Sequence, residues 1–342
     1  METKRRSVVL HSRPGGSPQI NNFALVEDEI PALRNGEVLT QTLWLSLDPY
    51  MRGRMDDVVS YAPSVKLGEP MTGETVGQVI ASKHAGFKPG EIVVGARGWQ
   101  SHIVSGGDDL LVLSGSAPHS AYLGVLGMPG ATAYAGMKQI GEPKAGETVV
   151  VSAASGAVGS VAGQLARRAG ARVVGVAGGE NKCRFVEDEL GFDTCIDYRA
   201  VTDLSAALRD VCPDGIDVYY ENVGGELQHA VFNQMNPFGR LIMCGMVGEY
   251  NDLVLRPGPN LRDTFIKRLR IQGFIVLDRK ENFTEWRELA EPWVAEGSLR
   301  YLEHVVVGLE NAPAAFIDLL RGTHLGKVVV RVADALDKAA FA

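Results

Sequence analysis

Hydrophobic and polar positions along the chain follow two different patterns, and the change comes near Tyr122. Before it, short apolar stretches alternate with turn dipeptides such as Asn35-Gly36 and Pro89-Gly90. This spacing is typical of β-strands joined by tight turns. The clearest strands are expected at Glu37–Leu45, Gly77–Ala81 and Glu91–Gly95. The first part of the chain is therefore predicted to be β-rich, in the form of a partly open barrel.

After Tyr122, apolar strands alternate with amphipathic helices. Strands are expected at Thr148–Ser152, Arg172–Val176, Thr194–Asp197, Ile216–Tyr220, Gly239–Cys244 and Leu269–Leu277. Helices are expected at Val158–Ala169, Asn181–Leu190, Asp203–Val211 and Glu226–Met235. This alternation predicts an α/β domain with a doubly wound parallel sheet of the Rossmann type.

Strand-like segments return at Glu303–Val307 and Gly326–Val332. We therefore expect the Rossmann domain, residues 126–294, to be inserted between two pieces of the β-rich domain, residues 1–125 and 295–342.

Composition narrows the classes of function. The 342 residues carry a net charge of -7, which disfavours a nucleic-acid partner because phosphate binding needs a basic surface. No apolar stretch is long enough to cross a membrane, and the run after Lys4-Arg5-Arg6 is too short for a signal peptide. A cytoplasmic protein is expected. The four cysteines lack CxxC spacing, so neither disulfides nor a cysteine-based zinc site is predicted.

A glycine-containing loop follows the first strand of the α/β part. The segment Ser152–Ser160 is a variant of the dinucleotide-binding fingerprint, in which Gly156 and Gly159 occupy two of the glycine positions. Gly156 would let the backbone approach a pyrophosphate, and Gly159 would let the helix pack closely on the strand. The position between a strand and a helix supports this interpretation over a turn without chemistry.

The end of the second strand predicts which nicotinamide cofactor is bound. NAD-binding proteins place an acidic residue there, whereas this strand ends at Ala177-Gly178-Gly179. Lys182 follows, and a cation suits the 2′-phosphate of NADP. The nearby Glu180 would favour NAD, but the missing acid at the strand end together with Lys182 favours NADPH over NADH.

Zinc ligands are missing from the β-rich part. Its N-terminal half contains no cysteine, and His84, His102 and His119 lack partners at ligand spacing. We therefore expect no metal.

Several motifs together resemble one family. They are Leu47–Met55, Gly127–Tyr134, Ala153–Gly159, Tyr220–Gly225, Cys244–Met246 and Gln272–Phe274. The chain resembles the zinc-free medium-chain dehydrogenase/reductases, in particular the leukotriene B4 dehydrogenase, prostaglandin reductase and alkenal double-bond reductase group. The resemblance implies a GroES-like barrel, a homodimer paired through Leu269–Leu277, and NADPH-dependent reduction of the C=C bond of α,β-unsaturated aldehydes and ketones.

The resemblance also implies a set of cofactor contacts. Lys182 and Tyr198 would hold the 2′-phosphate, Met128 and Thr132 would line the nicotinamide pocket, and Asn222 would contact the ribose-phosphate region. Phe274, Ile275 and Val276 would offer backbone groups to the nicotinamide amide. Further contacts are expected from Ala154, Gly156, Ala157, Val158, Gly159, Gly178 and Cys244. His324 replaces the family's usual asparagine, which leaves a cofactor contact there in question.

Tyrosines are the candidates for the substrate site. Tyr250 matches a family tyrosine near the substrate oxygen, where a phenol could donate a hydrogen bond to the developing enolate. Packing alone is the alternative role. Tyr50 and Tyr61 are expected to line the pocket. Arg52 and Arg54 could meet a carboxylate-bearing substrate, but arginines beside a turn more often face solvent.

Two other functions stay open at this stage. A quinone reductase would share the fold, the cofactor and the absence of zinc. A protein that binds NADP(H) for a structural or sensing role, without turnover, is the non-enzymatic alternative.

Overall fold

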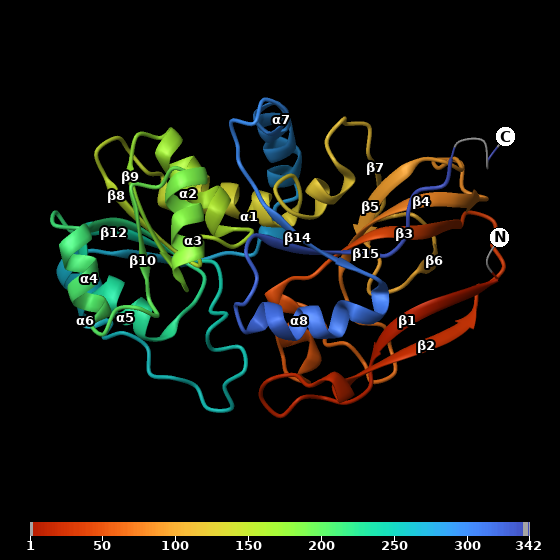
Figure 1. Ribbon diagram of the computed structural model, residues 1–342, viewed down its shortest axis with the longest axis horizontal. Helices are drawn as coiled ribbons and strands as arrows, with labels where there is room; N and C mark the ends of the chain where they lie inside the picture. The colour runs from red at the N-terminus through yellow and green to blue at the C-terminus, as the bar shows by residue number, and fades with distance from the viewer. Residues whose placement is uncertain (1–2, 338–340, 342) are drawn as a thin grey trace. The chain divides into compact units, whose positions relative to one another are not determined.

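A computed structural model describes residues 3–337 and 341, and Figure 1 shows their elements. The chain divides into two compact units, which are described separately. The first contains the chain up to Leu123, then Glu303–His324 and the chain from Val328 onward. The second contains Gly124–Leu302 and Leu325–Lys327. Residues 299–302 belong to the second unit, where the Arg300 N–H donates to Gln164 Oε1 at 2.8 Å.

The second unit is built on a six-stranded parallel sheet. Its strands are β8 (Thr148–Ser152), β9 (Arg172–Ala177), β10 (Thr194–Asp197), β11 (Ile216–Glu221), β12 (Met235–Met243) and β13 (Arg270–Gly273). They lie in the order β10-β9-β8-β11-β12-β13, and every pair is parallel. The direction of strand addition reverses next to β8, which confirms the predicted doubly wound topology.

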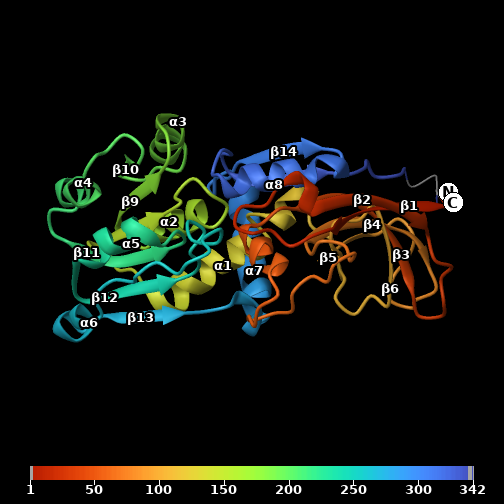
Figure 2. The same cartoon turned by 90° about the horizontal axis from the view of Figure 1, so that it is seen from below.

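Helices cover both faces of this sheet (Figure 2). They are α1 (Met128–Gly136), α2 (Gly159–Arg168), α3 (Glu180–Arg184), α4 (Leu204–Val211), α5 (Gly225–Phe232), α6 (Arg262–Lys267) and α7 (Glu281–Ala295). Tyr219 packs with Leu208 of α4 and Val231 of α5. Its neighbour Tyr220 points to the opposite face and lies against Gly136 of α1. Successive residues of β11 thus pack against helices on opposite faces of the sheet.

Three predicted elements of this unit differ from the structure. The helix expected at Glu226–Met235 ends at Phe232, because Met235 already pairs with Ile216 and begins β12. The helix expected at Asn181–Leu190 is α3 followed by a π-helical turn at Phe185–Glu189.

The strand expected at Leu269–Leu277 is the third difference. Only Arg270–Gly273 pairs with β12, and all four residues of β13 are exposed in the single chain. The following residues leave the sheet in a short 3-10 turn at Val276–Asp278.

The first unit contains a seven-stranded sheet and a separate hairpin. The hairpin pairs β1 (Lys4–Leu10) with β2 (Phe23–Glu29). The sheet contains β3 (Val38–Ser46), β4 (Glu74–Ser82), β5 (Ile92–Ala96), β6 (His102–Ser105), β7 (Leu111–Val112), β14 (Glu303–Val307) and β15 (Lys327–Arg331). Its order is β14-β15-β3-β4-β5-β7, with β6 also paired to β3. The predicted β-rich fold, completed by a late segment of the chain, is therefore confirmed.

Aromatic packing fixes the core of the first unit. Trp99 stacks on Phe23 with ring centroids 5.8 Å apart and meets Phe316 edge-on at 5.7 Å. Phe316 lies on α8 (Ala312–Leu320), so this helix is held by the same cluster.

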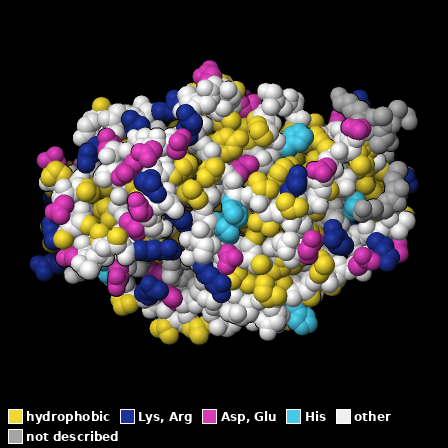
Figure 3. Space-filling view, viewed as in Figure 1, with side chains coloured by type: hydrophobic (Ala, Val, Ile, Leu, Met, Phe, Trp, Pro, Cys, Tyr) yellow, Lys and Arg dark blue, Asp and Glu magenta, His cyan; other side chains and the backbone are white. Residues whose placement is uncertain are grey.

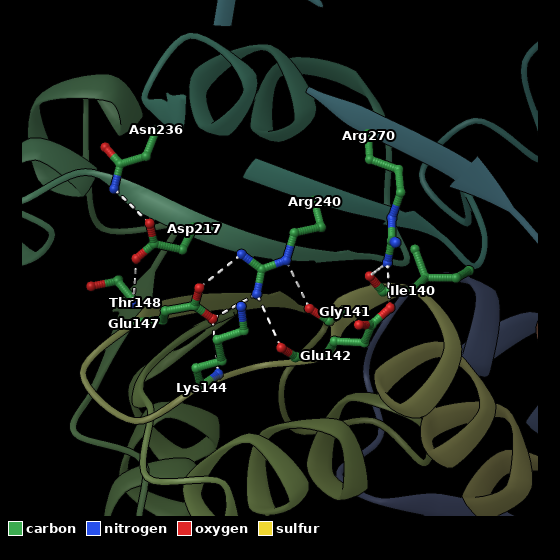
Figure 4. A network of polar contacts seen from close by, with 10 residues as sticks. All are labelled: Ile140, Gly141, Glu142, Lys144, Glu147, Thr148, Asp217, Asn236, Arg240 and Arg270. Carbon is green, nitrogen blue, oxygen red and sulfur yellow. Dashed lines mark hydrogen bonds and ion pairs between the residues drawn. The ribbon is translucent and has the colours of Figure 1, made fainter. Parts of the chain in front are cut away.

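A polar network pins the amino ends of the parallel strands (Figure 4). Arg240 donates to both carboxylate oxygens of Glu147, at 2.9 and 2.6 Å, and also to the carbonyl of Gly141. Asp217 accepts from the Thr148 N–H at 2.9 Å. These bonds join β8, β11 and β12 at the edge of the sheet opposite to the loops that follow the strands.

Charges of both signs are interspersed on the face seen in Figure 3, with apolar side chains between them. Among the described residues, we find no helix whose length and hydropathy would let it span a membrane.

Candidate functional site

In the loop between β8 and α2, only glycine fits at position 159. A Cβ on Gly159 would lie 2.4 Å from the Ala153 carbonyl oxygen, well inside van der Waals contact. Ala153 itself takes a φ of 49°, and the Gly156 N–H closes the turn onto its carbonyl at 2.9 Å. The loop is thus a tight backbone turn that faces the start of α2.

The first turn of α2 offers its N–H groups to a ligand. The helix begins after Val158 without a side-chain cap. Its dipole and its uncapped donors favour an anion there. Ala157 and Val158 are half-buried beside this end, and Ala154 is buried beneath it.

A cationic cluster lies after β9 and β10. The Tyr198 ring covers Gly178 so closely that a Cβ there would lie 2.8 Å from ring carbons and the hydroxyl. The Arg199 guanidinium lies 5.7 Å from the centroid of that ring. Burial, together with the charge of Arg199, lowers the pKa of the half-buried Lys182. Two cations and a phenol hydroxyl therefore gather at the strand ends, as a phosphate monoester would require.

The loops after β11 and β12 are tied to β8. Ser152 Oγ accepts from the Asn222 N–H at 2.7 Å and donates to Glu221 Oε1 at 3.0 Å. The Asn222 side-chain amide donates to the Ser152 carbonyl at 2.8 Å. The carboxamide of Asn222 is therefore held in a fixed orientation at the reversal point of the sheet.

Two carboxylates order the start of α5. Glu221 is fully buried and accepts from the N–H groups of Val223 and Gly224, yet burial raises its pKa. Glu249 Oε1 accepts from the Gly225 N–H at 2.7 Å. Because Glu249 precedes Tyr250, this bond anchors the loop that carries the tyrosine.

An open pocket of about 520 Å³ lies at the carboxyl ends of β12 and β13. It is lined by Met243, Cys244, Gly245, Met246, Tyr250, Gly273, Phe274, Ile275 and Asp278. Four residues predicted from the sequence, namely Cys244, Tyr250, Phe274 and Ile275, thus meet in one pocket. Burial raises the pKa of the Cys244 thiol to about 12, so the thiol stays protonated and is no nucleophile at neutral pH.

Other predicted cofactor residues of the second unit lie outside this lining. Val276 is buried. Met128 and Thr132 lie on α1, where the Thr132 hydroxyl donates to the Met128 carbonyl at 2.7 Å. The Thr132 carbonyl in turn accepts from the Tyr220 hydroxyl at 2.8 Å, which fixes α1 to β11.

The remaining predicted residues belong to the first unit. The Arg54 guanidinium lies over the rings of Tyr50 and Tyr61, 5.6 and 4.7 Å from their centroids. Burial raises the pKa of Tyr50, whereas Tyr61 is exposed. His324 stacks on His304 with ring centroids 4.2 Å apart.

Arg52 and Arg54 were expected to face solvent, and both are buried. Arg52 pairs with Asp56 at 2.7 Å and donates to the Gly16 carbonyl. Arg54 donates to the Pro63 carbonyl at 3.3 Å. Their charges are therefore used within the first unit.

Within residues 3–337 and 341, no group of three or more His, Cys, Asp or Glu side chains could hold a metal ion. His102, one of the three scattered histidines, is buried beside Ser101 at 3.1 Å.

The structure adds Arg199 and Asp278 to the candidates. Arg199 directly follows Tyr198, so an arginine after the third strand was a readable signal. Asp278 ends the 3-10 turn that follows β13, and the sequence offered no signal for it because the turn was predicted as strand.

Family models match both parts of the chain. One described as "N-terminal domain of oxidoreductase" matches residues 6–113. Another, described as "Zinc-binding dehydrogenase", matches residues 157–296.

Similar proteins cover nearly the whole chain. "NADPH-dependent curcumin reductase" of Escherichia coli (strain K12) is 47% identical, over 96% of this chain and 97% of its own. "Prostaglandin reductase 1" of Rattus norvegicus is 44% identical, over 92% and 95%. "2-alkenal reductase (NADP(+)-dependent)" of Nicotiana tabacum is 39% identical, over 97% and 98%. Among solved structures, CurA from Vibrio vulnificus in complex with NADPH has 47% identity and a TM-score of 0.92, over 96% and 99% of the two chains.

Proposed function

The chain belongs to the zinc-independent medium-chain dehydrogenase/reductase family, and from this membership we propose that it uses NADPH to reduce the C=C bond of α,β-unsaturated aldehydes and ketones. It is an NADPH-dependent reductase of the curcumin, prostaglandin and alkenal type. One observation carries the finer proposal. The phenol of Tyr250 faces an open pocket together with Phe274 and Ile275, next to the uncharged thiol of Cys244.

The second unit fits NADPH along the carboxyl edge of its sheet. The turn at Gly156 and Gly159 and the uncapped start of α2 would hold the pyrophosphate. Lys182, Tyr198 and Arg199 would bind the 2′-phosphate, with Gly178 leaving room for the Tyr198 ring. Asn222, whose amide is held by the Ser152 carbonyl, would contact the ribose-phosphate region of the cofactor.

The cofactor would supply the hydride for the β-carbon of the enone. Negative charge then develops on the carbonyl oxygen, and a donor fixed at that place lowers the barrier. Tyr250 would be this donor, because a phenol keeps its proton at neutral pH. Phe274 and Ile275 would exclude water on one side of the pocket.

The residues outside the pocket keep their predicted roles as proposals. Met128 and Thr132 would support the nicotinamide from α1, and Val276 would offer its backbone to the carboxamide. Tyr50 and Tyr61 would bind the conjugated part of the substrate. His324 would replace an asparagine contact to the cofactor.

NADPH oxidation with matched alkenals, enones and quinones tests this function. We expect the highest kcat/KM with enones or alkenals. A clear preference for quinones would favour the quinone reductase instead, and binding without turnover of any acceptor would favour the non-enzymatic alternative.

We also propose that the protein is a cytoplasmic homodimer. The exposed edge strand β13, with apolar Ile271 on it, can continue the sheet into a second copy. The four free cysteines suit a reducing compartment. Light scattering at micromolar concentration should give the mass of two chains, and the mass of one chain would contradict the dimer.

A further inference from the structure

Asp278 brings a negative charge to a pocket whose other walls are neutral. Methionine, glycine, Phe274 and Ile275 supply most of the lining. The Cys244 thiol and the Tyr250 phenol keep their protons at neutral pH. The Asp278 carboxylate is therefore the charged group among the described lining residues.

The backbone of Asp278 is held beside the pocket, and its side chain is exposed. The Asp278 N–H donates to the Ile275 carbonyl at 3.1 Å and closes the 3-10 turn that also presents Phe274 and Ile275. The cations that follow, Arg279 and Lys280, are not among the lining residues. In the part of the chain that the structure describes, no ion pair to Asp278 is found.

The arginines that could receive a carboxylate are occupied. Arg52 binds Asp56 and the Gly16 carbonyl, and Arg54 stacks on Tyr50 and Tyr61. Neither side chain is exposed. Both arginine charges are therefore already engaged by residues of the first unit.

We infer that Asp278 is a specificity-determining residue that selects neutral conjugated ketones and aldehydes over substrates with a carboxylate tail. Asp278 is exposed at the mouth of this open pocket, where a second negative charge would be repelled, and rejection of the wrong partner by such repulsion is a general route to specificity. The inference rests on the proposed reduction of enones, whose substrate class it narrows.

The test uses a matched pair of linear nine-carbon methyl enones. One ends in a carboxylate and the other in the methyl ester of that acid, so the pair differs mainly in charge. The measured quantity is the ratio of kcat/KM for the acid to kcat/KM for the ester. We expect Asp278→Asn to raise this ratio about tenfold, mostly through a lower KM for the acid. Asp278→Lys should raise it further.

Glu281→Gln is the matched control. Glu281 is exposed three residues further on at the start of α7, outside the pocket lining, and the variant loses the same unit of charge. Its ratio should equal that of the parent. High salt should also raise the parent's ratio, because the screening length falls from about 10 Å at 0.1 M to about 3 Å at 1 M salt.

The outcomes separate this inference from the proposed function. Turnover of both substrates with the same ratio in the parent and Asp278→Asn would overturn the inference and leave the function standing. If neither substrate turns over, the proposed function fails. The inference is then decided by calorimetric binding of the saturated acid and ester to the NADP complex, where an unchanged affinity ratio in Asp278→Asn would overturn it.

Discussion

The hydroxyl of Tyr250 lies directly over the Cα atom of Gly245, where a Cβ would come within 3.0 Å of the phenolic oxygen. Gly245 follows β12, and its N–H donates to the Glu221 carbonyl at 3.1 Å. Because Gly245 has no side chain, the tyrosine ring can lie close to the backbone at this position. Gly245 therefore helps to determine where the Tyr250 hydroxyl lies in the pocket. This relationship leads to two predictions about the same oxygen atom.

Tyr250→Phe keeps the ring and removes the donor. We expect kcat to fall roughly 10- to 100-fold, less than the loss of a sole oxyanion donor, because ribose hydroxyls of the cofactor can share the role. kcat/KM should fall equally, and the Kd for NADPH should stay within about twofold. A parent-like kcat with a raised KM would assign Tyr250 to packing.

Gly245→Ala keeps the hydroxyl and moves it. The added methyl forces a shift of a few tenths of an ångström, so we expect kcat to fall roughly threefold to tenfold. The Gly245→Ala, Tyr250→Phe double variant should be no slower than Tyr250→Phe, because the displaced group is already absent. Additive losses would show that the methyl acts on something other than the tyrosine.

Lys182→Ala and Arg199→Ala should each weaken NADPH binding. Loss of one charge-assisted contact to the 2′-phosphate raises the Kd for NADPH about tenfold or more, with little change for NADH. Arg184→Ala is the control, because Arg184 lies on the same helix and is already bonded to Asn181 and Glu180. Equal effects on both cofactors, measured by calorimetry, would contradict the assignment.

Glu147→Gln should destabilise the second unit in a pH-dependent way. Burial raises the pKa of Glu147, but the bonds from Arg240 and the Lys144 N–H outweigh it and hold the pKa below its usual range. A depressed pKa gives stability above the ordinary carboxyl range that is lost as pH falls through the folded-state value.

At neutral pH we expect Glu147→Gln to lower the unfolding free energy by about 1–2 kcal/mol, since water screens part of this half-buried pair. The difference from the parent should shrink in acid. Urea denaturation at several pH values measures it, with the exposed pair of Lys4 and Glu27 as control, where Glu27→Gln should change little. A pH-independent difference would show that shape rather than charge is responsible.

Gly159→Ala should disrupt the loop before α2. Its Cβ would meet backbone atoms of Ala153 and Ala154, which cannot swing aside as a side chain can. We expect a loss of about 1–3 kcal/mol of stability, as in other overpacked sites, together with at least tenfold weaker NADPH binding. Gly146→Ala tests the opposite case, since its Cβ would meet nothing within 4 Å and its positive φ alone opposes the change. Similar losses of NADPH affinity in both variants would rule out a specific role of the loop.

The parts of the fold that sequence predicted are those encoded by local patterns. The turn at Gly156 and Gly159 and the alternation of strands with helices depend on neighbours in the chain, and both are present. The end of β13 at Gly273 could not be read locally, because the apolar residues 274–277 that follow resemble more strand, whereas the chain leaves the sheet there. The nearness of Arg199 to Lys182 also depends on parallel pairing of β9 with β10, two elements apart in sequence.

The network of Arg240, Glu147 and Asp217 (Figure 4) lies at one rim of the parallel sheet, and the pocket lies at the other. We therefore expect that the stability and the proposed substrate specificity of this protein can be altered separately. A mutant library confined to Met246, Ile275 and Asp278 would vary the acceptor preference while the ion pairs across the sheet keep the scaffold folded. A directed-evolution experiment could therefore begin with the pocket residues, without prior stabilisation of the protein.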